Sequence, residues 1–180
     1  MKRSMIRFFL LTSVLTLAPA VYCQETTDVA REKTRERLGA LLQREGPGIK
    51  VAFRQSEKNP FNFIGLLKDG LKNAESMEIV IMVSKSDTIG FRIFPRYKGG
   101  YINIDKVRNS TQLLRQLIQF NEKTFLFWGA DDTGDIFTGY TFTLESGFPD
   151  DAIKIVLASI KNSDQFIGEL RPSIDGSNGP

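Results

Sequence analysis

The sequence predicts a single α+β domain in which an antiparallel sheet of about five strands is flanked by helices. Two hairpins predict the sheet: apolar, β-branched runs at 78–84 and 88–95 are joined by a short polar turn, and runs at 124–128 and 135–144 are joined by another. An amphipathic segment follows each hairpin and predicts a helix. Because hairpins pair strands antiparallel, the expected element order is α-β-(β)-β-β-α-β-β-α.

The chain ahead of the first hairpin begins with a charged helix over 27–45. Thr27 or Asp28 can cap it, and the breaker Gly46–Gly48 ends it. Its apolar residues are sparse at first and dense at the end, so we expect only the last turns to dock on the domain. Alternating apolar and polar residues over 49–54 predict the first strand.

The remaining elements are predicted from the spacing of apolar residues and from residues that start or end helices. The apolar run at 61–67 fits a strand or a short helix equally well. A helix is expected over 109–121, where apolar residues form one broad stripe. Pro149 and two aspartates start the last helix, with apolar residues at helical spacing up to residue 160. The short polar tail, 172–180, is expected to be disordered.

Residues 1–23 have the three-part layout of a secretory signal. Basic residues precede a short apolar stretch, and small residues flank two cleavage points, after Ala20 and after Cys23. The apolar stretch of roughly 15 residues is shorter than the ~20 that span a bilayer, so we expect a cleaved signal and an exported protein, periplasmic or secreted. A lipid on Cys23 stays open as a membrane anchor, although the bulky Tyr22 before it disfavours lipidation.

This signal divides the chain into four parts: the signal itself, a charged N-terminal helix over 24–48, an α+β domain over 49–171 and the tail over 172–180. The three basic residues of the signal account for the whole excess of 24 Lys and Arg over 21 Asp and Glu. The remaining chain therefore lacks the net or clustered positive charge that nucleic-acid binding needs, and no nucleic-acid partner is expected.

The composition excludes much catalytic chemistry. The chain has no His and one Cys, which rules out a Ser-His-Asp triad, a Cys-His pair and an imidazole zinc site. The aspartates over 131–135 lack the spacing of a calcium loop and fit a hairpin turn. The glycines over 98–101 lack the spacing of a phosphate loop. We expect no metal, no cofactor and no enzymatic activity.

The second hairpin is rich in aromatic residues on both of its faces. One face must pack on the helices, and a large exposed apolar patch on the other is typical of an interface. The candidate partner-binding residues are Trp128 and, as an extension of the same surface, Phe94, Tyr97 and Tyr101.

Three segments resemble a known family: a leucine-rich helix ending in Phe-Asn (113–123), the aromatic hairpin (125–144), and a Gly-Phe-Pro turn before the last helix (147–160). They are similar to the YbjN-like proteins, bacterial sensory transduction regulators whose fold is shared with type III secretion chaperones. The resemblance implies a secretion-chaperone-like sheet flanked by helices, often a dimer, and protein binding instead of catalysis. YbjN-like proteins and chaperones act in the cytosol, whereas this chain carries an export signal.

Two functions follow from these observations. The first is an exported, non-enzymatic protein-interaction domain, chaperone-like or regulatory, whose partner is another envelope or secreted protein or a second copy in a homodimer. The alternative is a small-ligand-binding protein or a carboxylate-based hydrolase in the same fold. The alternative requires a pocket with converging acids or a strongly perturbed Lys.

Overall fold

The computed structural model describes residues 20–176, and side chains from Asp28 onward. The predicted signal lies outside the described residues up to residue 19. The helical elements are α1 (Ala20–Glu45), the 3-10 turn η1 (Gly46–Ile49), α2 (Ser110–Lys123), α3 (Asp150–Ser159), the 3-10 turn η2 (Ile160–Ser163) and α4 (Asp164–Asp175). The strands are β1 (Arg54–Gln55), β2 (Asn62–Leu67), β3 (Ser76–Val83), β4 (Thr88–Tyr97), β5 (Gly100–Tyr101), β6 (Phe127–Ala130) and β7 (Ile136–Thr143).

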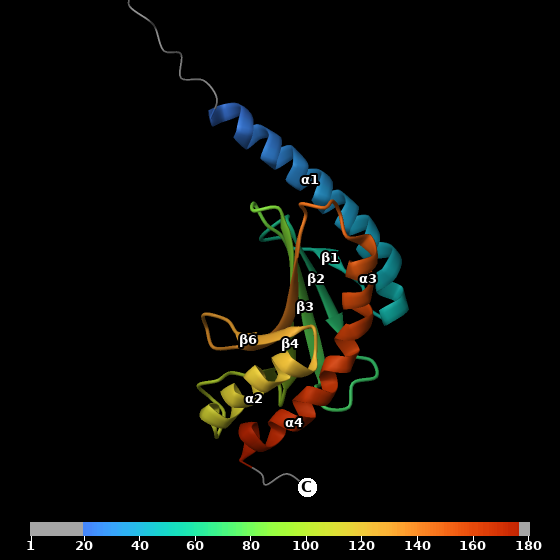
Figure 1. Ribbon diagram of the computed structural model, residues 1–180. Helices are drawn as coiled ribbons and strands as arrows, with labels where there is room; N and C mark the ends of the chain where they lie inside the picture. Colours follow the sequence, from blue (N-terminus) through green and yellow to red (C-terminus); the bar gives the residue numbers. More distant parts are fainter. Residues whose placement is uncertain (1–19, 177–180) are drawn as a thin grey trace, which may run out of the picture.

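The strands form one antiparallel sheet of seven in the order β1-β2-β3-β4-β7-β6, with β5 paired to the end of β4. Both predicted hairpins are present, as β3–β4 and β6–β7. α1, α3 and α4 follow one another along the same side of the sheet (Figure 1). α2 packs on that side too, since its Phe120 contacts the rings of Trp128 and Phe166. The predicted α+β class with helices on an antiparallel sheet is confirmed.

The core lies between the sheet and the helices. On β4, Ile89, Phe91 and Ile93 are fully buried, and the residues between them point the other way. The strand alternation that the sequence predicts for the second hairpin is confirmed, because Thr138 and Phe142 of β7 lie opposite Ile93 and Ile89.

α1 docks through its last turns, as expected. Leu38, Leu41 and Leu42 are buried, whereas Val29 is exposed. An expected cap at Thr27 or Asp28 is wrong, because the helix already runs through these positions from Ala20.

The sheet has two more strands than the predicted five, and its start differs from the prediction. Ile49 belongs to η1, Lys50 adopts a left-handed backbone conformation at the end of this turn, and residues 51–53 are irregular. The alternation over 49–54 therefore does not form a strand before Arg54. Only Arg54 and Gln55 pair with β2. The ambiguous run at 61–67 is a strand, held on both sides by β1 and β3.

The C-terminal end also differs from the prediction. The last helix is broken by η2, after which α4 begins at Asp164. The disordered tail expected from residue 172 is wrong for Pro172–Asp175, which complete α4. Ser173 is buried, and its hydroxyl donates to Gln116 Oε1 of α2 at 2.6 Å, which holds the helix end in place.

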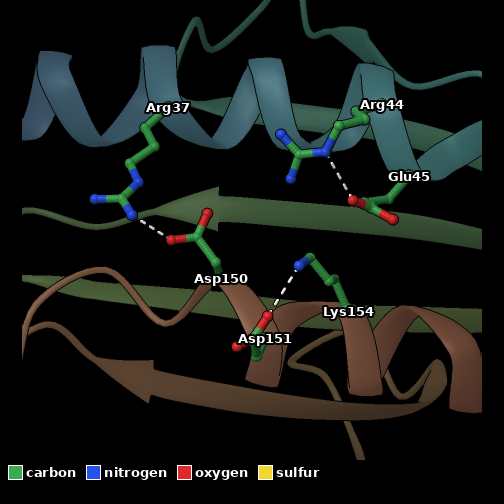
Figure 2. A network of polar contacts seen from close by, with 6 residues as sticks. All are labelled: Arg37, Arg44, Glu45, Asp150, Asp151 and Lys154. Atoms are coloured by element: carbon green, nitrogen blue, oxygen red, sulfur yellow. Dashed lines mark hydrogen bonds and ion pairs between the residues drawn. The ribbon is translucent and has the colours of Figure 1, made fainter.

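An ion pair joins α1 to the start of α3 (Figure 2). Arg37 pairs with Asp150, and Lys154 donates to Asp151 Oδ1 at 2.9 Å. Both aspartates lie in the first turn of α3, where the helix dipole favours acids. Their role as a helix start, expected from the sequence, is confirmed.

Candidate partner-binding face of the sheet

The helices leave one face of the sheet uncovered, and every second strand residue points to it. One row across this face consists, in register, of Arg54, Ile64, Val80, Arg92, Gly139 and Phe127. The neighbouring row consists of Leu66, Glu78 and Phe94. We call this surface the open face; its large side chains are Ile64, Leu66, Val80, Met82, Arg92, Phe94, Arg96, Tyr101, Phe127 and Phe137. Phe137 is only 7% exposed, and the others are half-buried or exposed.

The aromatic rings of the open face form a continuous chain of contacts, and two arginines lie over it. Phe137 contacts the rings of Phe127 and Phe94, each with 5.7 Å between ring centroids, and Phe94 contacts Tyr101 at 5.8 Å. The Arg92 guanidinium lies 4.6 Å from the ring centroid of Phe137 and 5.0 Å from that of Phe127. Arg96 lies over Tyr101 at 5.2 Å, so cations flank the aromatic row on both sides.

Gly139 provides the room for Arg92. A Cβ on Gly139 would lie 2.2 Å from the Phe91 carbonyl oxygen and 3.3 Å from Arg92 Nη1, so a side chain there would collide with the β4 backbone and crowd the guanidinium. In the space left free, Arg92 Nη1 donates to that carbonyl at 3.0 Å. Burial lowers the pKa of Arg92 from its ordinary value. Among the residues that the structure describes, no carboxylate pairs with Arg92.

Tyr101 and Glu78 form the polar end of the open face. The Tyr101 hydroxyl donates to Glu78 Oε2 at 2.7 Å. Burial, and next the hydrogen bond to Glu78, raise the pKa of Tyr101 to about 12. The phenol therefore stays protonated above its ordinary pKa of 10, and its hydrogen bond to Glu78 persists into the alkaline range.

Of the four predicted partner-binding residues, the structure brings two together. Phe94 and Tyr101 are neighbours on the open face. Tyr97 points to the helical side, where its hydroxyl donates to Asp175 Oδ2 of α4 at 2.8 Å. Sequence reasoning missed Arg92, which lies between the aromatic residues of the open face.

Trp128 does not contribute to the open face, contrary to the prediction. It lies opposite Thr138 and therefore points into the core, where only 4% of it is exposed. Its ring packs against Phe120 of α2 and Phe166 of α4. Its neighbour Phe127, one residue earlier, takes the place on the open face that the sequence assigned to Trp128.

A separate cavity of about 350 Å³ lies among η1, the β2–β3 loop and α3. Lys50, Asp69 and Lys161 line it, and Lys50 Nζ is 3.5 Å from Asp69 Oδ2. This volume is at the lower end of ligand sites. Its charged lining is two lysines and one aspartate, which lacks the pair of carboxylates that the predicted hydrolase requires.

The predicted hairpin turn at 131–135 is present. Asp131 Oδ1 accepts from the backbone N–H groups of Thr133 and Asp135, at 3.0 and 2.9 Å. Across residues 20–176, no three acidic, His or Cys side chains gather in a way that could hold a metal ion. No helix in the described part of the chain is long and apolar enough to span a bilayer.

No protein-family model matches the sequence, and no curated protein matches it. Among solved structures, the crystal structure of the ExsC–ExsE complex contains a chain that matches with 14% sequence identity and a TM-score of 0.45. The match covers 79% of this chain and 98% of that chain. At this TM-score the likeness decides neither the family nor the function, and membership of the YbjN-like family stays a prediction.

Proposed function

We propose that the chain is an exported, non-enzymatic protein-interaction domain, chaperone-like or regulatory, that binds another protein through the open face. The aromatic and arginine residues of that face carry the proposal. Where one face of an antiparallel sheet is exposed to water, the strand residues on that face are ordinarily polar. The open face instead presents Val80, Phe94 and Phe127. Aromatic residues and Arg are the types enriched at the centres of protein interfaces.

The sequence supports the remaining parts of the proposal. The layout of residues 1–23 supports export to the periplasm or beyond. The lack of His supports a binding role over acid–base catalysis. The resemblance to YbjN-like proteins supports a partner that is a protein.

A small anionic ligand in the cavity beside η1 is the second candidate. Lys161 favours it, because it lines the concave site beside Lys50, and Asp69 offsets only one of these two positive charges. Thermal melting of the purified chain with small carboxylates and phosphates tests this candidate, which predicts a melting shift that Lys161→Ala removes.

Paired variants test the interaction proposal. Val80→Lys places a charge at the middle of the open face, and Ile118→Lys places the same charge on α2, where Ile118 is 69% exposed. We expect a specific protein to be retained by affinity purification on the parent and on Ile118→Lys, and to be lost on Val80→Lys at unchanged melting temperature. Equal retention by both variants would contradict binding at the open face.

Light scattering on the purified chain separates a partner protein from a second copy. A dimer that Val80→Lys dissociates would place self-association on the open face. A monomer at all concentrations would leave a different protein as the partner.

A further inference from the structure

We propose that the partner segment bound by the open face is acidic as well as apolar, and that Arg92 receives its carboxylate. This inference rests on the proposed function and adds the chemistry of the partner. It follows from where Arg92 lies, from the hydrogen-bonding groups that it has left, and from the charge balance around it.

Arg92 occupies the middle of the longest row of the open face. Ile64 and Val80 lie on one side of it in register, and Phe127 lies on the other. β2, β3, β4, β7 and β6 together span about 20 Å at the spacing of neighbouring strands, which is wide enough for one helix or two strands of a partner. A segment docked along this row must cover the guanidinium.

The guanidinium is prepared to accept a carboxylate. Stacking beside Phe127 and Phe137 and the bond to the Phe91 carbonyl fix its plane. That bond uses one of the five N–H donors of the side chain. An arginine whose plane is fixed loses little conformational entropy when it binds a carboxylate through two parallel hydrogen bonds.

The charges around Arg92 are not balanced on the open face. Arg54, Arg92 and Arg96 contribute three positive charges, and no carboxylate pairs with any of them in the part of the chain that the structure describes. Glu78, the carboxylate of the same face, accepts from Tyr101 and offsets only one of these three charges. A neutral apolar partner would bury Arg92 without a counter-charge, which is costly.

This charge balance selects one occupant among several. A second copy docked face to face would bring six arginines together against two copies of Glu78, and this excess of positive charge would repel. Three arginines within an apolar surface are also fewer than a nucleic-acid groove presents. An acidic segment with apolar side chains satisfies both the arginines and the hydrophobic row.

A peptide selection tests the inference. A random dodecapeptide display library is selected on the purified chain, and the most enriched peptide is synthesised and titrated by fluorescence anisotropy. The variants are Arg92→Gln, which removes the charge, Arg92→Lys, which keeps it, and Arg115→Gln, a matched control on α2, where Arg115 is exposed. Melting temperatures verify that each variant is folded.

We expect enriched peptides to combine Asp or Glu with aromatic or aliphatic residues. Arg92→Gln should weaken binding by about tenfold or more, Arg92→Lys by less, and Arg115→Gln by under about twofold. Added salt should weaken binding to the parent more than to Arg92→Gln.

If the enriched peptides are neutral or basic and lose binding in Val80→Lys, the acidic preference is overturned and the proposed function still stands. Failure to enrich any peptide, or peptides that bind Arg92→Gln as well as the parent, would also overturn the inference. Vesicles containing phosphatidylglycerol that bind with the same dependence on Arg92, in place of peptides, would assign the face to an anionic lipid surface instead.

Discussion

A buried carboxylate organises the loop before β3. Asp164, at the start of α4, is 6% exposed. Its two oxygens accept the backbone N–H groups of Lys72 at 2.6 Å and Ala74 at 2.8 Å, and Asn73 donates to both. This explains why the last helix breaks at η2: the chain turns to place Asp164 against the loop.

Asp164→Asn should lower the free energy of unfolding by about 1–3 kcal/mol, because it replaces an anionic acceptor and leaves one backbone donor unpaired. Urea denaturation measures this loss. Asp151→Asn is the matched control: its ion pair with Lys154 is exposed, so its effect should stay under about 1 kcal/mol. Equal losses in the two variants would refute the role given to Asp164.

The raised pKa of Tyr101 should make the stability of the protein depend on pH in the alkaline range. Its pKa in the folded protein is raised to about 12, above the ordinary value near 10. The protonated phenol is therefore favoured by folding, and its contribution to stability is complete below pH ~10 and is lost as the pH rises toward 12. Ultraviolet titration of the phenols should show a late step that Tyr101→Phe removes.

Glu78→Gln tests the second cause of that shift. Without the carboxylate, the pKa of Tyr101 should fall toward its ordinary value, although burial still raises it. An unchanged late step in Glu78→Gln would assign the shift to burial alone.

At the scale of elements, α2 protects the edge of the sheet. β6 lies at the edge of the sheet and pairs with β7 on one side only. On its other side, the Asn121 side-chain amide forms hydrogen bonds with the β6 backbone. Asn121 Oδ1 accepts from the Trp128 backbone N–H at 2.6 Å, and Asn121 Nδ2 lies 3.4 Å from the Trp128 carbonyl oxygen. The Phe-Asn pair of the leucine-rich helix thus has a physical role: Phe120 packs in the core and Asn121 closes the edge.

Asn121→Ala should cost about 1–2 kcal/mol of unfolding free energy and expose the edge of β6 to pairing with another chain. Urea denaturation measures the first effect and light scattering against concentration the second. Gln119→Ala, an exposed change two residues earlier, serves as the control. A variant that stays monomeric and as stable as the control would argue against edge protection.

α1 is held by its second half. Leu38→Ala should lower the free energy of unfolding by about 2–5 kcal/mol, because Leu38 is fully buried against the sheet. Val29→Ala, on the exposed first half, should change it by less than about 0.5 kcal/mol. Thermal or urea unfolding of both variants distinguishes a docked helix end from a helix that is solvated throughout.

Element types could be predicted where a regular pattern of apolar residues extends over a long segment. β3, β4, β7 and α2 follow directly from their spacing. The Gly-Pro-Gly breaker predicts the turn at Gly46–Ile49, but the irregular backbone after it could not be foreseen, because the alternation over 49–54 imitates a strand. Nor could the break at η2, because apolar residues at helical spacing flank it, and the contact from Asp164 to the loop near Lys72 bridges ninety-two positions of sequence.

For the whole molecule, the sequence predicts the class of fold but not which aromatic residues face outward. The β6–β7 register decides this: Trp128 lies opposite Thr138 on the core side, and Phe127 opposite Gly139 on the open face. A shift of one residue would exchange them. Arg92 was missed because its importance depends on Phe127 and Phe137, which are distant in sequence and adjacent only in the folded sheet.

Photo-crosslinking in the native cell tests most sharply whether the open face binds a protein through Arg92. A photoreactive phenylalanine analogue replaces Phe94 on the open face in one variant, and Ile155, exposed on α3, in another. Binding at the open face through Arg92 predicts one defined protein adduct from position 94, none from position 155, and loss of the adduct when Arg92→Gln is added. Adducts from position 155 alone, or an adduct at position 94 that Arg92→Gln leaves intact, would contradict it.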